Sequence, residues 1–295
     1  MSQERSAPDA RAVSLMVLLT ALWGFQQVTI KLAAADVSLV MQSAIRSIVA
    51  TALVLLWCYF KKYNLFERDG TLAAGIAAGL LFAFEFVFIY GGLGYTNASR
   101  MSVFVYLAPP LTALGLHFFV AGERLGALQW GGVLVAFAGL FLAFSEGFYS
   151  GLDTWVGDLC GLAAAFLWAS TTVLIRATSL ARASATKTLF YQLALSALVL
   201  PIASLLMSER GITALTPLAL ASLAYQGVIV AFASYLAWFW LLTRYLAARL
   251  SVLSFLTPLF GMVSGVVFLS EPLSAHFAFA AALIAAGIAL VNLRR

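Results

Sequence analysis

Ten long apolar segments constrain the fold of this chain more than any other feature of its sequence. They occupy residues 12–34, 38–60, 71–91, 98–120, 126–146, 154–178, 184–207, 216–242, 249–269 and 273–293. About 20 apolar residues cross the hydrocarbon core of a bilayer as one α-helix. Charged residues make up only 10% of the chain, whereas soluble domains carry about 25%. The sequence therefore predicts an all-α integral membrane protein with ten transmembrane helices.

The distribution of lysine and arginine predicts how these helices are oriented. With the N-terminus inside, three of the 17 basic residues fall in outer segments, namely Lys31, Arg100 and Arg210, while Arg46 lies within the second span. The other thirteen lie in inner segments, and basic residues concentrate on the cytoplasmic side of membrane proteins. Both chain ends are therefore expected in the cytoplasm. The net charge of +5 reflects this orientation, and no nucleic-acid partner is expected.

The second half of the chain repeats the first. The stretch "LWGFQQVTIK" at 22–31 returns as "LWASTTVLIR" at 167–176, and "PLTALGLHFFVAGE" at 110–123 returns as "PLFGMVSGVVFLSE" at 258–271. We predict a cytoplasmic tail (1–11), a first five-helix repeat (12–146), an external linker (147–153) and a second repeat (154–293). Because five is odd, the second repeat enters the membrane from the opposite side. Inverted repeats place a substrate site near the bilayer midplane, which alternating access exposes to each side in turn.

These repeated motifs resemble the drug/metabolite transporter superfamily. The tryptophan pair of the first and sixth spans, with the "GERL" and "SEPL" sequences after the fourth and ninth, fits the EamA-type branch best, and within it the YddG-like amino-acid exporters. The resemblance covers nearly the whole chain. It implies two inverted five-helix repeats around a central cavity, with the fifth and tenth helices to the side. It also implies export of amino acids, aromatic ones included, or related metabolites across a bacterial-type inner membrane.

Polar and aromatic residues recur at the same depth in the first and sixth spans. The first carries Trp23, Gln26 and Gln27, and the sixth carries their counterparts Trp168, Thr171 and Thr172. A polar side chain at this depth must face protein or water. One interpretation is that the six residues line the substrate cavity, and the other is that they only hold helices together by hydrogen bonds. We favour the cavity, because tryptophan is oversized for tight helix packing.

Two charged residues lie deep within spans, Arg46 in the second and Glu85 in the third. At 1.5 Å per residue they are about 12 Å and 9 Å from the outer ends of their helices, so they can meet at similar depths. They are either a structural ion pair or a substrate site, in which Arg46 holds a carboxylate and Glu85 an ammonium group or a proton. Further polar candidates for substrate binding are Tyr90, Tyr106, Tyr191, Gln192 and Gln226.

Prolines within the paired fourth and ninth spans are candidate hinges. Pro109, Pro110 and Pro258 each remove a backbone donor, which favours kinks beside the cavity. Glu123 and Glu271 end these two spans, and we interpret them as structural caps. Asp158, near the outer end of the sixth span, is also expected to be structural.

Other classes of protein fit the sequence less well. There is no GxxxxGK[ST] stretch for ATP, so neither a nucleotide-binding partner nor a cofactor is expected, and no metal site is predicted. A polytopic membrane enzyme is the least favoured alternative, since the two histidines form no metal box. Aromatic walls with one acid also suit quaternary ammonium drugs, so drug efflux is the second hypothesis. We expect a secondary transporter that acts as a monomer in the bilayer on a small-molecule substrate.

Overall fold

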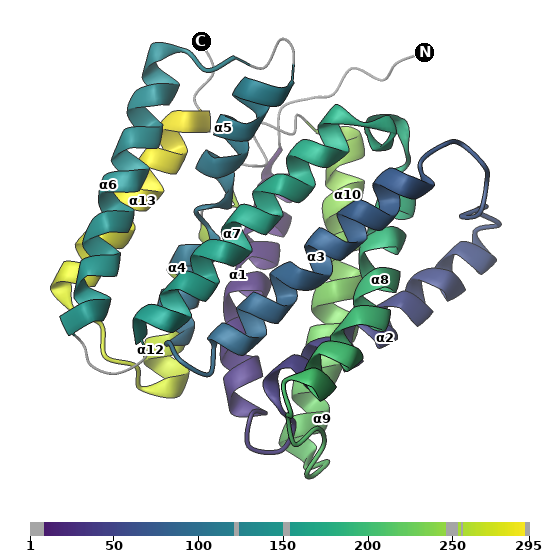
Figure 1. The fold of residues 1–295 in the computed structure, drawn as a ribbon, viewed down its shortest axis with the longest axis horizontal. Coiled ribbons are helices and arrows are strands. Elements are labelled where there is room, and N and C mark those ends of the chain that lie inside the picture. The colour runs from purple at the N-terminus through teal and green to yellow at the C-terminus, as the bar shows by residue number, and fades with distance from the viewer. Residues whose placement is uncertain (1–8, 121–123, 150–153, 246–252, 255, 293–295) are drawn as a thin grey trace.

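The computed structural model describes residues 9–120, 124–149, 154–245, 253–254 and 256–292, and helices dominate throughout (Figure 1). The helices run in the following order: α1 (Ala10–Leu32), α2 (Leu39–Phe60), α3 (Leu72–Gly92), α4 (Ala98–Val105), α5 (Ala108–Phe119), α6 (Ala127–Tyr149), α7 (Thr154–Ala177), η1 (Ser179–Arg182), α8 (Ala185–Leu206), α9 (Pro217–Ala224), η2 (Tyr225–Ser234), α10 (Tyr235–Arg244), α12 (Leu256–Leu269) and α13 (Ala275–Asn292).

These helices confirm the predicted spans. The fourth span consists of α4 and α5, and the eighth consists of α9, the π-helical segment η2 and α10. Within the described ranges, seven helical runs are long and apolar enough to cross a membrane, and three shorter apolar helices cover 127–143, 256–269 and 275–291. Parts of the predicted tail, linker and ninth span, together with Glu123, lie outside the described residues.

The packing relates the two halves by a pseudo-two-fold axis. Helix α1 packs on α12, and its counterpart α7 packs on α4 and α5. The pairs α2 with α8 and α6 with α13 each join equivalent helices of the two halves. Because each half contributes five spans, this arrangement is that of two inverted repeats.

Helices α6 and α13 pair at the edge of the molecule, at the left of Figure 1. Glycines let the two backbones approach closely: a Cβ at Gly132 would lie 2.7 Å from the Gly287 carbonyl oxygen, and one at Gly139 would lie 2.8 Å from that of Ala280. Small residues permit such contacts between membrane helices. The fifth and tenth spans thus lie to the side of the bundle.

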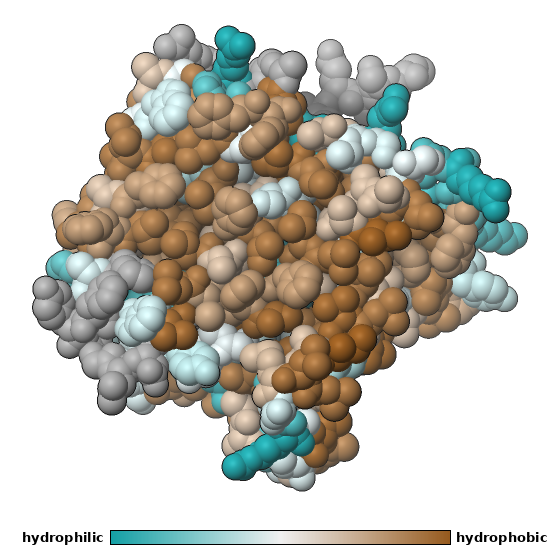
Figure 2. Space-filling view, in the orientation of Figure 1, coloured by the Kyte–Doolittle hydropathy of each residue, from teal (hydrophilic) through white to brown (hydrophobic). Residues whose placement is uncertain are grey.

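The surface has the polarity expected of a membrane-spanning bundle. Figure 2 shows an apolar surface across the middle of one face, with hydrophilic residues at its upper and lower margins. Large apolar side chains are exposed on α2, α3 and α8, among them Leu56, Phe84 and Leu198. The bundle has a terminal end, where α1 starts and α13 ends, and a distal end, which holds residues 33–38, 93–97, 207–216 and 270–274 (Figure 1).

The segment between α2 and α3 is fixed to the start of α8 at the terminal end. The Lys187 ammonium lies 2.8 Å from the Asp69 carboxylate and donates to the Glu67 carbonyl. Hydrogen bonds from Lys187 and Thr71 hold the pKa of Asp69 at about 2, below its ordinary value of 3.8. Through these contacts with Lys187 of α8, the segment between α2 and α3 links the first half of the chain to the second.

Helix breaks occur where the prolines predict them. The fourth span leaves helical geometry at Tyr106 and Leu107, immediately before Pro109 and Pro110 in the first turn of α5. Pro258 lies in the first turn of α12, where the Thr257 amide donates to the Ser254 carbonyl. The break in the fourth span is therefore present, and its use as a hinge stays a prediction.

Candidate functional site

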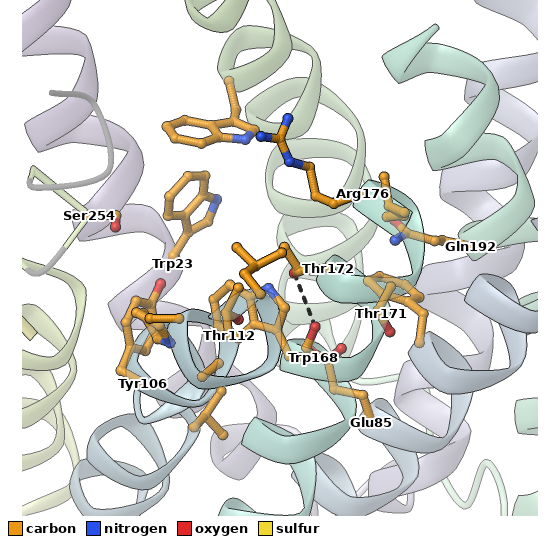
Figure 3. Close-up of a pocket in the computed structure, with 18 of the residues that line it drawn as sticks. Trp23, Glu85, Tyr106, Thr112, Trp168, Thr171, Thr172, Arg176, Gln192 and Ser254 are labelled. Carbon is orange, nitrogen blue, oxygen red and sulfur yellow. Dashed lines mark hydrogen bonds between the residues drawn. The ribbon is translucent and has the colours of Figure 1, made fainter. Parts of the chain in front are cut away.

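A cavity of about 920 Å³ lies at the centre of the bundle (Figure 3). Helices α1, α3, α5, α7, α8 and α10 contribute to its wall, so both halves of the chain form it. Ligand pockets have volumes of about 300–1,000 Å³, and this cavity is near the upper limit. Its lining includes Arg124, Gln129, Arg176 and Val291 at the terminal end, whereas on α3 it extends no further toward the distal end than Ile89. The cavity thus extends toward the terminal end.

The six repeated residues of the first and sixth spans all line this cavity. They are Trp23, Gln26, Gln27, Trp168, Thr171 and Thr172. Of the other predicted site residues, Glu85, Tyr106, Gln192 and Pro109 also line it. Arg46, Tyr90, Tyr191, Gln226, Pro110 and Pro258 are not in its wall.

The two tryptophans are held in place by aromatic neighbours. The Trp23 ring packs edge-on against Trp238 with centroids 5.9 Å apart, and its Nε1 donates to Ser234 Oγ at 2.8 Å. Trp168 packs edge-on against Tyr106 at 5.5 Å. Such edge-to-face pairs are favourable and fix ring orientation. Both Trp23 and Trp168 are drawn in Figure 3 among the lining residues, so each half of the chain contributes a flat aromatic surface to the cavity wall.

The threonines present a specific hydrogen-bonding surface. The Thr171 hydroxyl donates to the Leu167 carbonyl at 2.9 Å, and that of Thr172 donates to the Trp168 carbonyl at 3.1 Å (dashed in Figure 3). A hydroxyl has one hydrogen to donate and two lone pairs. With that hydrogen used within α7, both threonines can offer only acceptor oxygens to a substrate. They therefore suit a donor group such as an ammonium.

A buried hydrogen-bonded chain closes the cavity toward the distal end. Gln26 Nε2 donates to the Tyr90 hydroxyl at 3.2 Å, which donates to Gln226 Oε1 at 2.8 Å. Gln226 Nε2 donates in turn to Gln42 Oε1 at 2.9 Å, and Gln42 donates to the carbonyls of Ile30 and Val37. Tyr90 and Gln226 therefore do not contact the cavity as predicted, because these hydrogen bonds hold them behind its wall.

Tyr191 is also displaced from its predicted place in the cavity. Its ring packs against Gly75 of α3, where any side chain would collide with it, and its hydroxyl lies 3.2 Å from Thr71 Oγ1. Its neighbour Gln192 does line the cavity. Tyr191 thus joins α8 to α3 at the terminal end. Its depth along the helix does not fix how α8 is rotated about its axis, and this rotation directs the Tyr191 ring toward α3.

Arg46 and Glu85 are adjacent but make no ion pair in the part of the chain that the structure describes. The fully buried Arg46 guanidinium lies over the Phe86 ring at 4.2 Å, and its Nη2 donates to the Tyr235 hydroxyl at 3.2 Å. Its Nε and Nη1, and Glu85 Oε2, are buried with no hydrogen-bond partner among the described residues. Glu85 reaches the cavity, whereas Phe86 and Tyr235 separate Arg46 from it. The structure therefore does not support a structural ion pair.

A different buried ion pair exists, which was not predicted from the sequence. Arg100, assigned to an outer segment, is 6% exposed, and its Nη2 lies 2.5 Å from Asp158 Oδ2. A second hydrogen bond joins Arg100 Nε to Asp158 Oδ1 at 3.1 Å. The structural role expected of Asp158 agrees with this geometry. Both residues lie near the distal ends of packed spans, which is the one sequence signal that points to the pair.

The fold and the cavity define a polytopic membrane transporter built from two related halves. The chain belongs to the EamA-like transporter family, which matches it twice, at residues 10–145 and 155–293. The family resemblance and the ten-helix prediction are thus confirmed, and the chain is a transporter and not an enzyme.

Relatives and a solved structure agree with this assignment. An uncharacterized transporter of Bacillus subtilis is 25% identical, over 98% of this chain and 93% of its own. A protein of Escherichia coli named "Probable amino-acid metabolite efflux pump" is 24% identical, over 93% of this chain and 92% of its own. A crystal structure with 23% identity superimposes with a TM-score of 0.67 over 98% of both chains, which supports the fold.

Proposed function

We propose that this protein is a secondary transporter that exports amino acids, aromatic ones included, and related metabolites by alternating access. The observation that carries the proposal is a central cavity with tryptophan walls beside two opposite buried charges that have no ionic partner among the described residues. A buried polar group without a partner calls for an explanation such as a missing ligand or water. The name of the Escherichia coli relative supports the same substrate class.

An amino acid brings groups that match this arrangement. Its ammonium suits the Glu85 carboxylate and the acceptor oxygens of Thr171 and Thr172. Its carboxylate suits Arg46, whose planar guanidinium binds carboxylates through two parallel hydrogen bonds. Contact with Arg46 requires Tyr235 to release its single hydrogen bond to the guanidinium. An apolar side chain then lies between Trp23 and Trp168.

The direction of transport follows from the predicted orientation. The cavity extends toward the terminal end, which the basic residues assign to the cytoplasm of a bacterial-type inner membrane. This conformation then corresponds to the state that an exporter loads. Labelling of single cysteines with an impermeant reagent from outside the cell tests the orientation: position 274 should react and position 122 should not. Equal labelling would contradict the inverted topology.

One observation favours a second function, the efflux of quaternary ammonium compounds. Glu85 reaches the cavity and Arg46 does not, while the lining arginines Arg124 and Arg176 lie at the terminal end. The inner part of the cavity therefore offers an acid and aromatic rings, which together attract organic cations. The two proposals differ in whether Arg46 takes part in binding.

Counterflow in liposomes distinguishes the two functions. Purified protein is reconstituted and tested for exchange of labelled substrate against a panel of all common amino acids and one quaternary cation. We expect exchange of amino acids, strongest for those with large apolar side chains, with no chemical change to the substrate. Exchange of the cation alone would support drug efflux, and exchange of neither would contradict both.

A further inference from the structure

An acidic cap at the distal end of the bundle links the two halves. Glu271, which follows α12, accepts three hydrogen bonds from the first turn of α4: Oε1 from the Ala98 amide at 2.7 Å, and Oε2 from the Ser99 amide at 2.9 Å and hydroxyl at 2.6 Å. The N-cap residue of α4, Asn97, makes no capping bond itself. A carboxylate is the favoured partner for these amides. The second half of the chain therefore caps a helix of the first.

Beside this cap, α4 and α12 meet at small residues, and Met262 of α12 lies in the same buried apolar cluster as Val103 and Phe104 of α4. Ser102 of α4 lies directly against Gly261, and Ser99 lies against Gly265. These small residues let the two helices approach closely but bury little apolar area, and buried apolar area is the main source of packing energy. The three hydrogen bonds to Glu271 therefore add a polar contribution to the packing that keeps this seam closed.

The largest other contact of α12 is with α1 and that of α4 is with α7, while α4 also has smaller contacts with α1 and α3. Helix α12 packs on α1, where a Cβ at Gly24 would lie 2.6 Å from the Gly261 amide nitrogen. Helix α4 is joined to α7 by the ion pair of Arg100 with Asp158. By the pseudo-two-fold axis these are equivalent pairs. The seam between α4 and α12, together with the smaller contact of α4 with α1, is therefore the boundary between the two pairs.

Helix α4 also reaches the substrate space. It has eight residues, about 12 Å of helix, and spans the distance from the Glu271 cap to the cavity. Val105 at its end and the next residue, Tyr106, both line the cavity, and Tyr106 packs on Trp168. A movement of α4 therefore changes the cavity wall as well as the seam.

We propose that the seam between α4 and α12 is the distal gate of the transporter and that the Glu271 cap keeps it closed. Release of the cap separates the α1–α12 pair from the α4–α7 pair and opens the cavity to the distal end. This inference rests on the alternating-access function proposed above. The carboxylate favours the closed state because its three hydrogen bonds exist only there, and a group that interacts with one state shifts the population toward it.

A second cap at the same end provides a matched control. Glu209 accepts from the amides of Val40 and Met41 at 2.9 and 3.0 Å and from the Ser38 and Ser204 hydroxyls. It caps α2, and no residue of α2 lines the cavity among those described. Glu209 and Glu271 thus share their chemistry and location, but only Glu271 closes the seam. Glu209 is a structural cap in this account.

The test measures the exposure of the seam. Ser102 is 2% exposed and lies in the seam, so Ser102→Cys, with Cys58 and Cys160 replaced by alanine, serves as the reporter. The rate at which the introduced thiol reacts with a membrane-impermeant maleimide is measured in purified protein. We expect Glu271→Gln to raise this rate at least about ten-fold, which corresponds to ~1.4 kcal/mol in the closing equilibrium. Ser99→Ala, which removes one of the three hydrogen bonds, should raise it less.

The Glu209 variant distinguishes the opening of a gate from a general loosening of the protein. Glu209→Gln should leave the labelling rate of the thiol at position 102 within about two-fold of the parent. Equal acceleration by both variants, or by neither, would overturn the gate. Size-exclusion chromatography shows whether Glu271→Gln folds. If it does not, the labelling rates of Ser99→Ala and Ser38→Ala are compared instead, because these hydroxyls donate to Glu271 and to Glu209 respectively. Counterflow by the parent protein reports on the proposed function separately, since normal exchange with no Glu271 effect contradicts the gate alone.

Discussion

Arg100 and Arg46 are both buried in the bundle, yet their surroundings differ. Arg100 makes two hydrogen bonds to Asp158 and donates a third to the Ala143 carbonyl at 2.7 Å. Arg46 makes one hydrogen bond, to Tyr235, and two of its nitrogens have no partner among the described residues although Glu85 is close. The first arginine lies at the distal end, between packed helices. The second lies one side chain behind the central cavity.

This difference indicates separate uses of buried charge. An isolated buried charge is strongly unfavourable, and a pair offsets that cost only when its hydrogen bonds are well satisfied. Arg100 and Asp158 meet this condition and hold α4 on α7. Arg46 and Glu85 lack such hydrogen bonds, so the presence of these two buried charges is better explained by a substrate or proton that completes the site. The comparison therefore predicts that one pair governs stability and the other governs transport.

Loss of one partner of the distal pair should have the largest effect on stability. Asp158→Asn leaves the Arg100 charge buried without its counter-ion, which costs about 3–5 kcal/mol. We expect a clear fall in the melting temperature of the purified protein. The double variant Arg100→Met with Asp158→Leu removes both charges and should recover most of the loss. A melting temperature unchanged in Asp158→Asn would show that this pair is not structural.

Loss of the cavity acid should lower transport and spare stability. Glu85 Oε2 has no hydrogen-bond partner in the described part of the chain, so Glu85→Gln breaks no hydrogen bond of this oxygen and removes a buried charge. We expect counterflow to fall at least about ten-fold, equivalent to ~1.4 kcal/mol of lost substrate interaction, with little change in melting temperature. The opposite outcome, normal counterflow with a large loss of stability, would show that Glu85 has a structural role like that of Asp158.

The aromatic walls should have an intermediate effect. Trp168→Ala removes a flat surface and its edge-on contact with Tyr106. Such contacts contribute about 0.5–1.5 kcal/mol, so we expect the apparent affinity in counterflow to weaken up to about ten-fold, with substantial rescue by Trp168→Phe. Trp23→Ala should behave similarly. Trp57 is 41% exposed on the outer face of α2, and Trp57→Ala is the control that should transport normally.

The smallest effect is expected at Ser234, which positions Trp23. Ser234→Ala removes the acceptor of the Trp23 Nε1 hydrogen bond, a contribution of about 0.5–1.5 kcal/mol. The apparent affinity should weaken about two- to five-fold, and the intrinsic fluorescence of the protein should change as the indole loses its hydrogen bond. Identical affinity and fluorescence would mean that Trp23 is fixed by packing on Trp238 alone.

Much of this fold could be predicted because hydropathy, turn residues and prolines act locally. The ten spans follow from apolar length, and the break in the fourth span follows from Pro109 and Pro110. The duplicated positions also predicted that Trp23 and Trp168 line one cavity, since equivalent helices bring residues of equal depth together at a pseudo-two-fold axis; their contact with a substrate stays a prediction. The ten-residue π-helical segment η2 has no such signal, because it depends on how the eighth span packs against α1 and α2.

The candidate site was less predictable because depth along a helix does not fix rotation about its axis. Tyr90 and Gln226 have the right depth, but their hydrogen bonds with Gln26 and Gln42 lie behind the cavity wall. Arg46 and Glu85 likewise share a depth, yet Phe86 and Tyr235 lie between Arg46 and the cavity. Side-chain partners of this kind are decided by tertiary packing, which a single sequence does not specify.

The double variant Arg46→Gln with Glu85→Gln tests the central claim most directly. If the two charges serve only each other, removing both should restore whatever the single variants lose, as expected for Arg100 and Asp158. If they serve a substrate or a proton, nothing is restored, because the binding groups are gone. We predict that the double variant folds with near-normal thermal stability and that its amino-acid counterflow stays as low as in the single variants. Recovery of counterflow to near the parent rate would contradict this account.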